Sequence, residues 1–215
     1  MRHFSTLLLK EERAIFASPI AYATVAVYLL LMGYTFTAVL FLLIVPVVTM
    51  RLFAEERRTG TLELLLTSPV QEIEIVLAKF VAGLTLPALM LGLTGSYAVV
   101  LGLYGDPDWG PIYSGFLGLL LLAAALTAIG LLVSGLVSNQ IVAAIVAMGA
   151  GILLWMIDTL GYLLPDPFDT IITHLSMVAH FSPFATGALF LSDVGFFLTI
   201  VLVGLFLSVR ALARR

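Results

Sequence analysis

The chain has 215 residues, of which 61% are hydrophobic and only 11% are charged. A soluble domain of this composition would lack a polar surface, so the lipid bilayer is its expected solvent. The absence of cysteine excludes disulfides and Cys-ligated metals, and the formal net charge of -3 matters less than the side of the membrane on which each charge lies.

Uncharged runs define the predicted membrane spans. One crossing needs roughly 20 apolar residues. The runs at 14–50 and 109–157 are each long enough for two crossings joined by a turn, and we place these turns at 33–35 and 138–140. The expected spans are 16–33, 36–53, a third that ends near Tyr104, 113–137, 140–162 and 194–210.

Residues 1–15 are predicted to form a helix that lies in the membrane interface. Phe4, Leu7, Leu8 and Ile15 share one helical face, away from the basic side chains. The alternative is a frayed, charged tail.

The third span has the best-marked start. The residues Ser68-Pro69-Val70-Gln71 resemble a capping box, with Ser68 as the cap and Pro69 at the first helical position. This helix is therefore expected to begin in the cytoplasm, with Pro87 near the middle of the membrane. The turn formers at 105–111 predict an external loop after it.

The segment 163–193 is predicted to form external, re-entrant helices. It contains His174, His180 and a Ser182-Pro183 break. If it crossed fully, the C-terminal arginines would lie outside, against the rule that basic residues stay in the cytoplasm. Six crossings with both termini cytoplasmic place all ten Lys and Arg residues inside.

Motifs for catalysis are absent from the sequence. Lys10 and Lys79 are the only lysines, and neither lies in a glycine-rich phosphate loop, so the chain is not expected to hydrolyse ATP. His174 and His180 have a poor spacing for metal ligands and favour a structural role. The interiors of the predicted spans hold no ionisable group that could bind a coupling ion, so energy for transport would come from another protein.

The longest predicted cytoplasmic segment, 54–74, is the natural place for a partner to bind. It combines mixed charge, a glycine break and an apolar edge formed by Leu62, Leu65 and Leu66. The alternative, from composition alone, is a solvated loop.

Several stretches of the chain resemble the ABC-2 type permeases, closest to the gliding-motility and related permease subunits. They read MRLFAEERRTGTLELLLTSPV, EIVLAKF, DPDWGPI, SNQIVAAI and FLTIVLVGLFLSVRALARR, in the order of the family. The resemblance implies an all-α, polytopic inner-membrane protein with six transmembrane helices. One departure is the tight turn between the first two spans, where relatives often have a longer external segment.

The resemblance also implies a function. Such a chain is the permease subunit of an ABC exporter, moves a substrate that the sequence does not identify, and forms a homodimer or a pair with a related permease. It binds no cofactor, because ATP and Mg²⁺ bind to separate ATP-binding subunits. Nucleic acid is not an expected partner. The implied docking element consists of Glu55, Glu56, Arg57, Arg58, Thr59, Gly60, Thr61, Leu62 and Glu63.

Two other classes remain possible from the sequence. The first is a membrane scaffold or assembly factor that uses the same segment to hold a cytoplasmic partner without transport. The second is an ion channel, although no polar stripe is evident that could line a pore.

Overall fold

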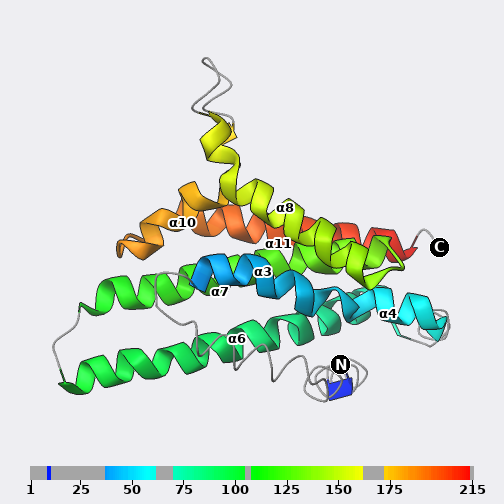
Figure 1. Cartoon of the computed structure of the whole chain (residues 1–215), viewed down its shortest axis with the longest axis horizontal. Helices are drawn as coiled ribbons and strands as arrows, with labels where there is room; N and C mark the ends of the chain where they lie inside the picture. Colours follow the sequence, from blue (N-terminus) through cyan, green and yellow to red (C-terminus); the bar gives the residue numbers. More distant parts are fainter. Residues whose placement is uncertain (1–8, 11–36, 62–69, 105–107, 162–171, 214–215) are drawn as a thin grey trace.

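The computed structural model describes residues 9–10, 37–61, 70–104, 108–161 and 172–213 (Figure 1). The elements named here are all α-helices. In chain order they are α3 (Thr37–Thr49), α4 (Arg51–Thr59), α6 (Glu72–Tyr104), α7 (Trp109–Leu136), α8 (Gln140–Gly161), α10 (Met177–Ala185) and α11 (Leu191–Ala213).

Five helical stretches in the described part are long and apolar enough to cross a membrane. Helices α3 and α4 together form one of them, and the others lie in α6, α7, α8 and α11. The prediction of an all-α polytopic protein is confirmed, and these stretches correspond to the second through sixth predicted spans. The first, 16–33, lies outside the described residues, as does the interfacial helix 1–15 except at Leu9 and Lys10.

Helix α7 is the centre of the bundle and contacts every other helix named above. Glycines at its interfaces allow these close approaches. A Cβ atom on Gly130 would lie 2.0 Å from Thr49 Oγ1 of α3, and one on Gly118 would lie 2.6 Å from Phe184 Cβ of α10. Because neither distance is sterically possible, the two glycines are required for α3 and α10 to pack where they do.

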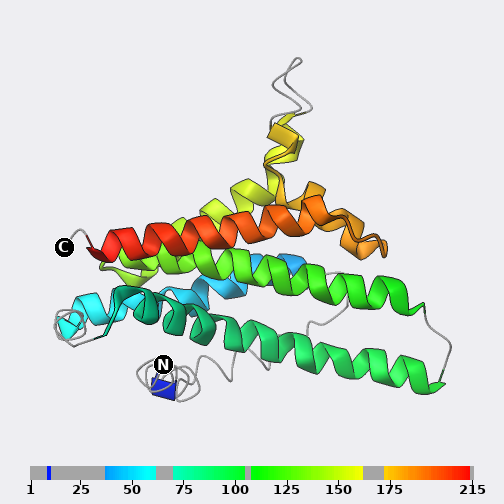
Figure 2. The ribbon, with the colours of Figure 1, turned by 180° about the vertical axis from the view of Figure 1, so that it is seen from behind.

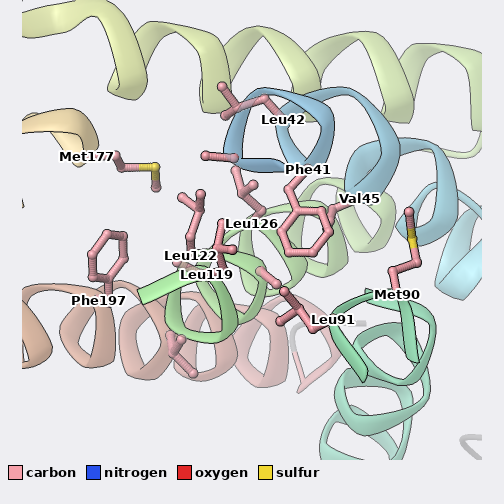
Figure 3. Close-up of a cluster of buried hydrophobic side chains, with 14 of the residues drawn as sticks. Phe41, Leu42, Val45, Met90, Leu91, Leu119, Leu122, Leu126, Met177 and Phe197 are labelled. Carbon is pink, nitrogen blue, oxygen red and sulfur yellow. The ribbon is translucent and has the colours of Figure 1, made fainter. Parts of the chain in front are cut away.

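The main apolar cluster surrounds α7 (Figure 3). Helix α3 contributes Phe41 and Val45, and α6 contributes Met90, all fully buried. Met177 of α10 and Phe197 of α11 extend the cluster toward the other side of α7. Since all these helices bury side chains in one cluster, they form a single packed unit.

The two ends of the bundle are built differently. At one end, α4 and the start of α6 meet the ends of α7 and α11, where a second apolar cluster includes Leu52, Ile75 and Leu212 (Figures 1 and 2). At the opposite end α10 covers the start of α7, and Ser114 Oγ donates a hydrogen bond of 2.8 Å to the carbonyl oxygen of Phe184. The first is called here the α4 end and the second the α10 end.

Two predicted helix starts are wrong by a few residues. Helix α7 begins at Trp109, inside the predicted loop, because the Asp108 carboxylate accepts a hydrogen bond from Gly110 N at 3.0 Å and caps the helix. Helix α6 begins at Glu72 rather than at Pro69. The carbonyl of Gln71 accepts the first helical hydrogen bonds, from the N–H groups of Glu74 and Ile75. The proposed cap itself, Ser68, lies outside the described residues.

The remaining boundaries agree with the predictions or extend them. Helix α8 starts at Gln140 as predicted, and the side chain of Asn139 accepts a hydrogen bond of 2.9 Å from Ile141 N. Helix α6 has 33 residues and is about 50 Å long, so it extends beyond a hydrocarbon core of about 30 Å. Helix α10 has only 9 residues, about 14 Å, which is too short to cross. The re-entrant assignment of 163–193 stays a prediction.

Candidate coupling site

Helix α4 is held against the bundle by its backbone as well as by its apolar side chains. Ser134 Oγ of α7 donates to the carbonyl of Met50 at 2.9 Å and lies 3.0 Å from the N–H groups of Phe53 and Ala54, from which it accepts. These contacts satisfy backbone groups at the junction between α3 and α4. The direction of α4 is therefore fixed by α7.

Gly60 ends α4 in the left-handed conformation, with φ of 73°. Its N–H lies 3.4 Å from the carbonyl of Arg57, and no atom outside its immediate neighbours lies within 4 Å of a Cβ built at this position. The glycine is therefore required by backbone conformation and not by crowding. On either side of Gly60, the hydroxyls of Thr59 and Thr61 lie 2.9 Å apart.

A buried ion pair joins α4 to α6. Lys79 of α6 is 2% exposed, and its Nζ lies 3.0 Å from Oε1 of Glu56. The same ammonium donates to the carbonyl oxygen of Leu52 and lies 5.0 Å from the centre of the Phe53 ring. Lys10, near the N-terminus, reaches the same Glu56 oxygen at 3.3 Å. Three distant segments of the sequence thus meet at one carboxylate.

The predicted docking residues separate into two groups. Glu56 and Arg57 are half-buried and turn toward the protein. The others that the structure describes form the α4 tip, an exposed set that consists of Glu55, Arg58, Thr59, Gly60 and Thr61. Leu62 and Glu63 lie outside the described residues. A partner could thus touch the α4 tip directly, whereas Glu56 acts within the chain.

Sequence analysis did not identify the role of Lys79. The residue was placed on the cytoplasmic side as one of ten basic residues, and span interiors were expected to hold no ionisable group. That expectation stays a prediction, because Lys79 and Asp193, both buried, lie near the starts of α6 and α11 and not in the middle of these helices. A usable signal was the position of Lys79 between apolar residues, Ala78 and Phe80, directly before the uncharged run 80–105.

The arrangement of histidines and carboxylates in the described ranges bears on metal binding alone. They contain no group of three or more His, Asp or Glu side chains that could hold a metal ion. His174 and His180 do not share a ligand site, because the His174 side chain is exposed and only its carbonyl oxygen contacts His180.

Comparison with protein families identifies a transporter family. The model of the ABC-2 family transporter proteins covers residues 18–209, which include every helix described above except the last residues of α11. The chain belongs to the ABC-2 transporter family. A search of curated proteins finds no match.

Membership in the ABC-2 family fixes the coarse function. The chain is a multi-pass membrane protein and a permease component of an ABC transporter, a class that works with an ATP-binding partner. The match does not distinguish the gliding-motility subfamily, which stays a prediction. In an ABC-2 permease, the α4 end with its exposed tip and its buried ion pair is the candidate site at which such a partner acts.

Proposed function

We propose that this chain is the permease subunit of an ABC exporter in the inner membrane. A separate ATPase subunit hydrolyses ATP, and its work reaches the permease through the α4 tip. The permease acts as a homodimer or with a related permease. The direction of transport and the pairing rest on the resemblance to ABC-2 permeases.

The observation that carries this proposal is the construction of α4. Its tip is exposed, while its body is fixed to α7 through Ser134 and to α6 through Lys79. A rigid element fixed to two long helices moves those helices when it is displaced. A solvated loop without such attachments would absorb the displacement instead. This favours a coupling element over the alternative of a passive loop.

The distribution of charge supports a cytoplasmic α4 end. Arg51, Arg58 and Lys79 lie on α4 or near the start of α6, and Arg210 lies in the last turn of α11 at the same end. The α10 end carries Asp108 and Asp193 instead. This asymmetry follows the rule that basic residues remain in the cytoplasm.

The decisive experiment is reconstitution of the full chain with the ATP-binding subunit encoded beside it. The two proteins are expected to co-purify, and ATP turnover is expected only when the ATP-binding subunit is present. A probe on the α4 tip should report a change on addition of ATP. The control is an ATP-binding subunit that binds nucleotide without hydrolysis.

Two results would contradict the proposal. One is ATP turnover by this chain after removal of every co-purifying protein. The other is a stable complex with the ATP-binding subunit in which ATP changes neither the positions of the membrane helices nor the rate at which any cargo moves. The scaffold alternative predicts this second result.

A further inference from the structure

A groove opens on the surface of the α4 end, apart from the α4 tip. Its walls are residues 70–73, at the start of α6, and the last residues of α11, and its volume is about 620 Å³. Val70 and Ile73 line one side, and Val209 and Leu212 line the other. The proposed function assigns no role to these residues.

The groove lies at the edge of the hydrocarbon core. Helix α11 has 23 residues and is about 34 Å long, slightly more than a core of about 30 Å. Because Leu191 begins this helix at the α10 end, Leu212 reaches the opposite boundary of the core. Across the groove, the side chain of Ile73 is 51% exposed. A large apolar side chain is therefore uncovered where lipid tails end.

The rim of the groove is polar and acidic. Gln71 and Glu72 line it beside the apolar residues, and no Lys or Arg of the described part does so. The guanidinium of Arg210, in the last turn of α11, lies instead 5.3 Å from the centre of the Phe206 ring. An apolar floor with an acidic rim fits an apolar side chain that has a basic neighbour. An anionic phospholipid fits less well, because Glu72 would repel its phosphate.

The floor of the groove continues the surface on which α4 lies. Leu212 is a buried member of the second apolar cluster, and Val70 and Val209 pack against that cluster. Leu52 and Phe53 of α4 are buried in the same cluster. A protein that contacts α4 from the cytoplasm is therefore close to a continuous apolar surface that leads into the groove.

The α4 tip is a small surface for a stable complex. Protein interfaces of standard size bury about 800 Å² on each partner and involve roughly 20 to 30 residues a side. The α4 tip has five described residues, all charged, threonine or glycine. Such a set lacks the apolar anchor that usually dominates binding, whereas exposed Ile73 can supply one.

We propose that this groove is a second contact surface for the ATP-binding subunit, which inserts an apolar side chain flanked by a basic residue. The proposal rests on the proposed function, because that function supplies the partner. An occupant of the groove touches α6 and α11 together. The ATP-binding subunit then acts on α11 directly, and not only through α4.

The first test identifies the occupant of the groove. The chain has no cysteine, so a benzophenone maleimide can be attached at Gln71→Cys, an exposed position on the rim. The full chain is reconstituted in lipid nanodiscs with the ATP-binding subunit encoded beside it. Illumination is expected to link the probe to that subunit. Capture of lipid alone, capture of a second copy of this chain alone, or no capture would overturn the proposal.

The second test compares two matched substitutions, Ile73→Asp and Ile141→Asp. Each isoleucine is the second residue of a membrane-length helix, α6 or α8, and they are 51% and 68% exposed. Aspartate suits the first turn of both helices, but Ile141 does not line the groove. The affinity for the ATP-binding subunit is expected to fall roughly tenfold with Ile73→Asp and to change by less than about twofold with Ile141→Asp. Equal affinities of the two variants would contradict the proposal.

Glu72→Gln tests the charge of the partner. The carboxylate attracts a basic group across the rim, and this attraction is screened by salt. The affinity of Glu72→Gln is expected to be lower by roughly threefold at low salt and to depend less on salt than that of the parent chain. An unchanged salt dependence would exclude a basic neighbour at the rim.

Failure of this proposal can be distinguished from failure of the proposed function. If Glu55→Lys with Arg58→Glu loses the ATP-binding subunit while Ile73→Asp binds as the parent chain does, the groove is not a contact and the role of α4 stands. If the parent chain itself does not bind the subunit, the proposed function fails. If Ile73→Asp does not fold, capture by the probe at Gln71→Cys decides.

Discussion

Lys79 Nζ and Glu56 Oε1 lie 3.0 Å apart and link α6 to α4, and the lysine side chain is only 2% exposed. Removal of one partner from a fully buried pair costs about 3 to 5 kcal/mol. Here Glu56 keeps its contact with Lys10 at 3.3 Å, which compensates part of the lost charge. The Glu56 side chain retains 13% exposure, so we expect Lys79→Met to lower the free energy of unfolding by about 2 to 3 kcal/mol.

The matched control for this prediction is the double variant Lys79→Met, Glu56→Leu. It removes both charges and should recover much of the stability. Thermal unfolding in detergent compares the stability of the parent chain, the Lys79→Met variant and the double variant. A double variant that is less stable than Lys79→Met would show that the pair is not the source of the loss.

Charge reversal at the α4 tip should weaken partner binding without unfolding the permease. Glu55 and Arg58 are exposed, so Glu55→Lys with Arg58→Glu removes partner contacts and little packing. We expect affinity for the ATP-binding subunit to fall by roughly tenfold, together with transport. The control is Asp108→Ser at the α10 end, which keeps a capping oxygen. The coupling assignment is wrong if Asp108→Ser loses the ATP-binding subunit and the tip variant keeps it.

Gly60→Val tests the backbone turn after α4. The left-handed conformation costs a residue with a Cβ about 1 to 2 kcal/mol, and more if it is β-branched. Because the position is open, we expect a small change in the unfolding temperature but a marked loss of coupling between ATP turnover and transport. Gly60→Asn, which tolerates this conformation, should keep coupling. Equal loss in both variants would point to a side-chain clash with the partner instead.

Ser134→Ala should destabilise the attachment of α4 to α7. The hydroxyl makes three contacts with the α4 junction, and an unsatisfied buried backbone group costs about 1 to 3 kcal/mol. Ser208→Ala is the matched control, since Ser208 is equally buried but donates only within its own helix, to Gly204 at 2.7 Å. The unfolding temperature should fall for Ser134→Ala and change little for Ser208→Ala. The reverse order would contradict the attachment.

The predicted topology can be tested with single cysteines. On intact cells, a membrane-impermeant thiol reagent should label Leu191→Cys and Trp109→Cys at the α10 end. It should label Thr61→Cys and Ala213→Cys at the α4 end only after the membrane is opened. Labelling of Thr61→Cys from outside would invert the assigned orientation.

Apolar runs were enough to predict five of the helical stretches, because a bilayer demands one continuous helix per crossing. The start at Gln140 was predictable from Asn139, a polar residue between two apolar runs. Trp109 was assigned to a loop because Gly110 and Pro111 read as turn formers, although proline is also tolerated in the first turn of a helix.

The candidate site was only partly accessible to sequence reasoning. The segment could be located from its charges, but the division between exposed Glu55 and inward-facing Glu56 depends on the direction in which α7 holds α4. That direction is set by Ser134, which is 80 residues away from Ala54 along the chain. The contact of His180 Nδ1 with Asp193 Oδ1 at 2.8 Å likewise requires the turn between α10 and α11, which has no periodic pattern.

The central position of α7 has a consequence for biogenesis. Helices α3 and α6 leave the ribosome before α7, yet both bury their apolar faces chiefly against it. Until α7 is inserted, the described contacts that can join the earlier helices are those of Lys79 with α4, the apolar contacts of α4 with the start of α6 and a limited α3–α6 contact. In a nascent chain that stalls before Trp109, the surface around Thr49 that packs against Gly130 of α7 would face lipid or an insertase. Membrane quality control would then recognise the chain as unassembled.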